Sequence, residues 1–125
     1  MGPTQWLVAG AGLLFLLVLL SGLWLYRSGK PFPGIILTVH KLVSLGAAAC
    51  VVIAIYQMSQ VAALSAIEAS AGVASGVLFL ATVASGGLLS TAKPMPGAVL
   101  LLHRITPFLT VLATAIILYL LLSRT

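Results

Sequence analysis

The stretches KPFPGIILTVHK (residues 30–41) and KPMPGAVLLLHR (residues 93–104) are nearly identical, and they carry the main information about the fold. They align without a gap at an offset of 63 residues. Each consists of a Lys-Pro-x-Pro-Gly turn, an apolar run, and then a histidine followed by a cation. The repetition predicts a duplicated two-helix hairpin in which His40 and His103 occupy equivalent positions.

The composition is typical of an integral membrane protein. The 125 residues are 62% hydrophobic and 6% charged, whereas about 25% of a soluble domain is charged, so this chain cannot cover a water-facing surface. Glu68 is the sole acidic residue beside six Lys and Arg, which gives a net charge of +5. That excess suits anionic lipid headgroups. We expect no nucleic-acid partner, because no basic cluster is long enough to follow a phosphate backbone.

Four apolar stretches are long enough for the roughly 20 residues that a helix needs to cross a bilayer. The predicted spans are about 5–26, 33–56, 68–89 and 96–121. Short connectors make neighbouring helices antiparallel, while the connector near 57–67 is longer and weakly apolar. We therefore expect one all-α domain over residues 1–125. It is an antiparallel four-helix transmembrane bundle with repeat units of about 5–58 and 68–121.

The repeat also predicts where the two histidines lie. Because each unit crosses the membrane twice, both copies insert in the same orientation, and their symmetry axis lies along the membrane normal. His40 follows Pro33 by seven residues, and His103 follows Pro96 by the same number. At ~1.5 Å per residue, each histidine lies roughly 10 Å below the start of its helix. If one histidine points to the bundle axis, the other does so from the opposite side.

Paired histidines inside a bilayer favour a ligand role. A lone histidine in a helix is more often a satisfied polar group, but ionisable residues in membranes are costly and usually functional. A closed zinc site needs four ligands, and Cys50 lies about 15 Å deeper than His40, too far to contribute. Haem supplies four nitrogens itself. We therefore expect one haem b between the second and fourth helices, with His40 and His103 as axial iron ligands.

Four cations flank the predicted site. Lys30 and Lys93 precede the two helices whose N-termini favour anions, so they suit the haem propionates. Lys41 and Arg104 follow the histidines directly and can snorkel toward the same surface, where they could reach propionates or lipid phosphates. Lipid anchoring is the alternative for all four side chains.

Small residues from the other two helices are predicted at the level of the histidines. Ser21 and Gly22 reach that level from the first helix, and Ser85, Gly86 and Gly87 from the third. Such residues leave room for a flat macrocycle. Either serine could accept the proton on the second nitrogen of a ligating imidazole and fix its tautomer, and a backbone carbonyl could do so equally well.

The sequences HKL (40–42) and HRI (103–105), each after a Lys-Pro-x-Pro-Gly turn, resemble those of small transmembrane b-type cytochromes, including the cytochrome b561-like group. They also look like an uncharacterised set of short bacterial membrane proteins. The resemblance implies a four-helix core in which histidines from separate helices bind haem b. Cytochrome b561-like proteins usually carry four ligand histidines and two haems. Only His40 and His103 carry over, so a second haem is not expected and electron transfer across the whole membrane is in doubt.

Two axial imidazoles leave no open iron position, which favours an electron carrier over a stand-alone enzyme. A quinol or a redox protein is the expected partner. Two alternatives remain open from the residues. One is a small membrane transporter or metal-handling protein, for which Glu68 would have to be deeply buried beside a polar cavity. The other is a haem-binding subunit of a larger complex.

The expected location is a membrane, and the resemblance suggests the bacterial inner membrane. The positive-inside rule places the short loops with Arg27, Lys30 and Lys93 in the cytoplasm and both termini outside. Lys30 and Lys93 weaken this inference, because they suit propionates equally well.

Overall fold

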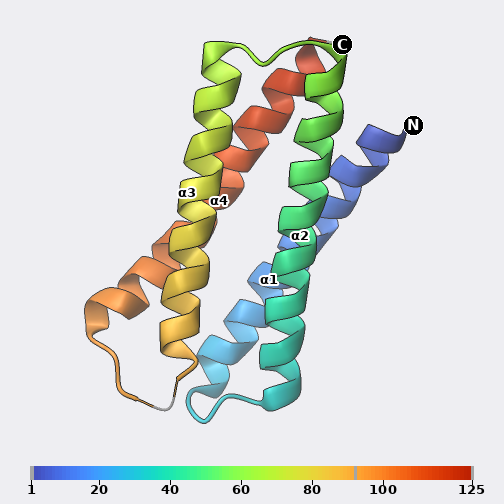
Figure 1. Cartoon of the computed structure of the whole chain (residues 1–125). Coiled ribbons are helices and arrows are strands. Elements are labelled where there is room, and N and C mark those ends of the chain that lie inside the picture. Colours follow the sequence, from blue (N-terminus) through green and yellow to red (C-terminus); the bar gives the residue numbers. More distant parts are fainter. Residues whose placement is uncertain (1, 92, 125) are drawn as a thin grey trace. The chain divides into compact units, whose positions relative to one another are not determined.

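The chain is helical throughout its regular structure. A computed structural model describes residues 2–91 and 93–124. This described part has four helices and no strand (Figure 1). The helices are α1 (Pro3–Ser28), α2 (Gly34–Val61), α3 (Ala66–Leu89) and α4 (Gly97–Ser123). The all-α fold class is confirmed.

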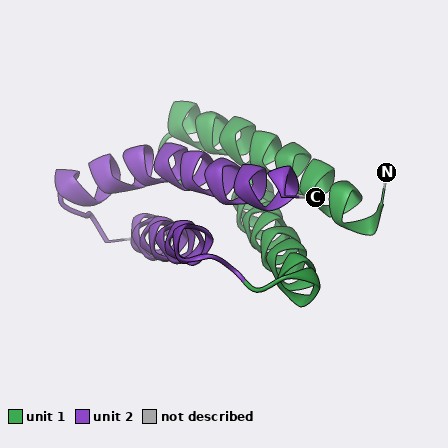
Figure 2. Cartoon of the chain, turned by 90° about the horizontal axis from the view of Figure 1, so that it is seen from above, with its two compact units in different colours: residues 1–63 green, residues 64–125 purple. Residues whose placement is uncertain are grey.

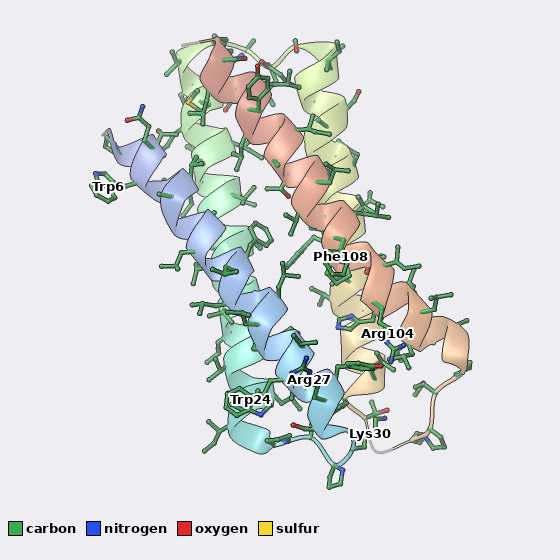
Figure 3. All side chains as sticks on the ribbon, turned by 180° about the vertical axis from the view of Figure 1, so that it is seen from behind. Trp6, Trp24, Arg27, Lys30, Arg104 and Phe108 are labelled. Atoms are coloured by element: carbon green, nitrogen blue, oxygen red, sulfur yellow. The ribbon has the colours of Figure 1, made fainter. Side chains whose placement is uncertain are left out.

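Each helix is long and apolar enough to cross a membrane. The shortest, α3, has 24 residues and is about 36 Å long, against roughly 30 Å for the hydrocarbon core of a bilayer. Trp6 and Trp24 lie near opposite ends of α1 (Figure 3), and both side chains are exposed. Interfacial aromatic residues of spanning helices take such positions. The chain is consistent with an integral membrane protein.

The helix boundaries differ from the predicted spans for local reasons. α2 and α4 begin one residue late, because Pro33 and Pro96 are their N-cap residues and not the first helical residues. α2 also continues to Val61, since no proline or glycine interrupts 57–61. The expected long connector is therefore reduced to residues 62–65.

A capping box sets the start of α3. The Ser65 hydroxyl accepts the Glu68 N–H at 3.2 Å, and the Glu68 carboxylate accepts the Ser65 N–H at 2.8 Å. This reciprocal pair satisfies two donors that the first turn of a helix leaves without intrahelical partners. The helix consequently begins at Ala66, two residues before the predicted start.

The chain divides into two compact units, residues 1–63 and 64–125, which are coloured separately in Figure 2. In the first, which we call unit 1, α1 packs on α2. In the second, unit 2, α3 packs on α4. The boundary falls between the two predicted repeat units.

A polar contact joins the two helices of each unit at the end opposite their connector. In unit 1, the Thr4 hydroxyl donates to the side-chain oxygen of Gln57 at 2.8 Å. In unit 2, Arg124 Nη1 donates to Glu68 Oε2 at 3.0 Å and forms an ion pair. The first turn of one helix therefore meets the last part of the other within each unit.

Buried positions of α2 recur in α4. In unit 1 the buried residues of α2 are Ala47, Val51, Ala54 and Met58. Those at the positions 63 residues later are Thr110, Thr114, Ile117 and Leu121, and all four are buried in α4. This spacing forms one stripe along a helix. The stripe is apolar in α2 but carries two threonines in α4.

Ile117 and Ile116 give a matched test of the α4 core. Ile117 is 0% exposed and Ile116 is 46% exposed. We expect Ile117→Ala to destabilise the protein by about 2–4 kcal/mol, because it removes buried methyl groups and leaves a cavity. Ile116→Ala should cost less than about 1 kcal/mol. The free energy of unfolding in detergent, titrated with a denaturing detergent, measures both. Equal losses would contradict the assignment of the core face.

Candidate functional site

His40 contacts the end of α1 within unit 1. Its Nδ1 lies 2.9 Å from the Ser21 hydroxyl oxygen. The same hydroxyl donates to the main-chain carbonyl of Val18 at 3.1 Å, which uses its one hydrogen. The hydroxyl oxygen therefore accepts a hydrogen bond from His40, and the hydrogen-bond network places the imidazole proton on Nδ1. On the main chain of the same residue, the His40 carbonyl accepts the Ser44 hydroxyl at 2.6 Å.

His103 makes the corresponding contact within unit 2. Its Nδ1 lies 3.1 Å from the Ser85 hydroxyl oxygen and 3.0 Å from the main-chain carbonyl of Thr82. A carbonyl only accepts, so Nδ1 must carry the proton. The Ser85 hydroxyl itself donates to the carbonyls of Ala81 and Thr82 at 2.8 and 3.0 Å. Both contacts thus assign the same tautomer.

His40 and His103 share the same tautomer, with the proton on Nδ1. In a neutral imidazole with its proton on Nδ1, the lone pair belongs to Nε2. Metal-ligating histidines commonly have this arrangement, in which the second nitrogen donates to a fixed acceptor that orients the ring. His40 and His103 lie in different units, and each arrangement is complete within its own unit.

A glycine lies against each imidazole ring. A Cβ atom added to Gly22 would lie 3.2 Å from His40 Cε1, and one added to Gly86 would lie 2.7 Å from His103 Cε1. A Cβ on Gly87 would meet nothing within 4 Å. Of the residues predicted at the level of the histidines, Ser21 and Gly22 contact His40, and Ser85 and Gly86 contact His103. Their role toward a cofactor stays a prediction.

The four predicted cations are all exposed. Lys30 lies in the α1–α2 connector, where its Nζ is 6.0 Å from the centroid of the Phe32 ring, within range of a cation–π contact. Lys93 lies in the connector before α4, and Lys41 and Arg104 follow the histidines on α2 and α4. Figure 3 marks Lys30 and Arg104. Contacts of these side chains with propionates or lipids stay a prediction.

Glu68 is buried at 7% exposure. Its carboxylate accepts the Ser65 N–H and the Arg124 guanidinium, as described above. These partners account for a buried carboxylate without a transport role, since buried charges are usually paired.

The described residues contain no cluster of three or more His, Cys, Asp and Glu side chains that could hold a metal ion. Cys50 is half-buried on α2. Within the described residues, neither Glu68 nor Cys50 therefore forms a metal site of three or more ligands with a histidine.

Sequence reasoning missed the polar face between α3 and α4. Thr82 supplies the carbonyl for His103, and its hydroxyl lies 3.4 Å from that of Thr110. Ser75 and Thr114 are 3.2 Å apart between their hydroxyl oxygens. The available signal was the spacing of the threonines at 106, 110 and 114, which are four residues apart and therefore lie on one helical face.

The tautomers can be measured directly, because the sequence has two histidines and so gives two imidazole spin systems. In cofactor-free protein at alkaline pH, ¹⁵N NMR of labelled histidine should show the proton on Nδ1 in both rings. Ser21→Ala should weaken this preference in His40 and leave His103 unchanged. A proton on Nε2 in either ring of the unmodified protein would contradict the assignment.

The adjacent glycines Gly86 and Gly87 provide a matched pair of variants to test the contact between Gly86 and the His103 ring. Gly86→Ala should displace the His103 ring, because the new methyl group would overlap Cε1. Gly87→Ala should leave the ring in place. The imidazole chemical shifts report the displacement. Equal shifts in the two variants, or none in Gly86→Ala, would show that the ring does not lie on Gly86.

Two histidine–serine–glycine arrangements, one in each unit, are the most distinctive feature of the described residues. Comparisons of the chain with protein-family models, curated proteins and solved structures found no match. The proposal of a function therefore rests on the chemistry of these two arrangements.

Proposed function

We propose that the chain is a b-type membrane cytochrome that binds one haem b between His40 of α2 and His103 of α4 and carries electrons. The observation that supports it best is the shared tautomer, with Nδ1–H donated to Ser21 and Ser85 and the lone pair on Nε2. Coordination to iron requires such a lone pair. Two imidazoles and the four nitrogens of a porphyrin complete a six-coordinate iron.

The surroundings of the rings fit a flat cofactor. Gly22 and Gly86 bring backbone, and no side chain, against the imidazoles. Small residues of this kind permit close approach of another group in a membrane bundle. The serine contacts hold each ring in one orientation, so the cost of ordering the ligands is met before a cofactor binds.

The proposal requires the two units to be copies of one duplicated hairpin. It also requires them to pack together as one antiparallel four-helix bundle. The recurrence of buried positions at an offset of 63, from Ala47 and Thr110 to Met58 and Leu121, supports this architecture. In such a bundle, parallel repeats are related by an axis along the membrane normal. His40 and His103 then lie at equal depth on opposite sides of the axis.

The exposed cations suit the acidic groups of haem. Lys30 and Lys93 precede the N-termini of α2 and α4, where the positive end of each helix dipole favours propionates. Lys41 and Arg104 extend from the same helices and would bind propionates or lipid phosphates.

A bound haem supplies one-electron chemistry, and the protein orients it, excludes water and sets its electrostatics. With both axial positions filled by histidine, electron transfer is favoured over reactions at the metal. The partner we propose is a quinol or a redox protein. The membrane we propose is the bacterial inner membrane, with the short connectors in the cytoplasm and both termini outside.

Absorption spectra of the purified protein, oxidised and reduced, test this proposal. Protein produced with ample haem supply should show a sharp Soret band and split visible bands on reduction, as expected for two histidine ligands. His40→Ala and His103→Ala should each alter or abolish these bands. Lys41→Ala is a control from the neighbouring position on α2 and should keep the spectrum. A featureless visible spectrum, unchanged after haem is added, would reject the proposal.

A further inference from the structure

The surroundings of His103 combine three restraints on the ring. The Thr82 carbonyl, part of the α3 main chain, accepts from Nδ1 at 3.0 Å. Ser85, which is 2% exposed, accepts from the same nitrogen. Gly86 lies so close that a Cβ there would be 2.7 Å from Cε1. The ring is therefore fixed by main-chain groups as well as by a buried hydroxyl.

Additional hydroxyl contacts join α3 to α4, one of them at Thr82 beside His103 and the other farther along the helices. Thr82 and Thr110 approach to 3.4 Å, and Ser75 and Thr114 to 3.2 Å. Thr110 and Thr114 are each 4% exposed. Hydrogen bonds contribute to the association of membrane helices, so these contacts support the register of α3 against α4.

The surroundings of His40 are built differently. Ser21, which accepts its Nδ1–H, is half-buried. Gly22 is farther from the ring, since a Cβ there would lie 3.2 Å from Cε1. The positions of α2 that correspond to Thr110 and Thr114 are Ala47 and Val51, whose apolar side chains form no hydrogen bond. The register of α1 against α2 next to His40 therefore depends on close packing of apolar groups.

We infer that the two histidines would hold a haem unequally: His103 is the anchoring ligand, and His40 is the ligand that is displaced from the iron more readily. This inference rests on the proposed function. If His40 were displaced, its ring would remain hydrogen-bonded to Ser21.

The retention of haem by single-ligand variants tests this assignment. His40→Ala should keep most of its haem and bind carbon monoxide when reduced, because His103 remains restrained. His103→Ala should lose haem faster by on the order of 10-fold or more, as expected when a restrained ligand is removed. The haem-to-protein ratio, the rate of haem transfer to a soluble apo-globin, and the carbon monoxide difference spectrum are the readouts.

Matched serine variants keep the test valid if a histidine variant folds poorly. Ser85→Ala should accelerate haem transfer more than Ser21→Ala does, and far-ultraviolet circular dichroism should show that both remain helical. Equal rates, or the reverse order in either pair of variants, would overturn the inference while leaving the cytochrome proposal intact. Wild-type protein that binds no haem would instead overturn the proposed function, and the inference with it.

Discussion

Each histidine donates its Nδ1 proton to a hydroxyl on the helix packed against it, and the rest of each unit is arranged around that bond. A buried polar group in a membrane costs several kcal/mol unless it is hydrogen-bonded. The bond needs a short residue at the contact, hence Ser21 and Ser85. It also needs the backbone of the second helix to come close, so a glycine follows each serine. The polar contacts at the other end of each helix pair keep the register that this geometry demands.

The depth of the contacting serines and glycines along their helices was predictable from the sequence, because short connectors and a fixed rise per residue determine it. The side of the helix on which each residue lies, relative to the histidine, was not predictable. Gly86 and Gly87 lie at nearly the same depth, but successive residues point about 100° apart, and only Gly86 lies against the ring. The serines correspond at an offset of 64, while the histidines correspond at 63. The serine lies 19 residues before the histidine in unit 1 and 18 residues before it in unit 2. The Thr82 carbonyl could not be anticipated, since every residue has one.

The two units place different chemistry at equivalent core positions. Helices in lipid gain little from burying apolar surface against each other, so they associate through close packing or hydrogen bonds. Unit 1 uses the small side chains of Ala11, Ala47 and Ala54. Unit 2 uses buried hydroxyls and fills the remaining space with Ile117 and Leu121. The two helix pairs are thus stabilised by different kinds of interaction, and their histidines are restrained by different groups.

The ion pair between Glu68 and Arg124 has a consequence for how the chain enters a membrane. Glu68 is the sole acidic side chain, and its pairing with Arg124 makes that end of unit 2 electrically neutral. The other five cations all lie within residues 27–41 and 93–104. Positive charge next to a spanning helix resists translocation. In a membrane, the positive charge that would orient the nascent chain is therefore confined to two short segments, and these segments contain the histidines.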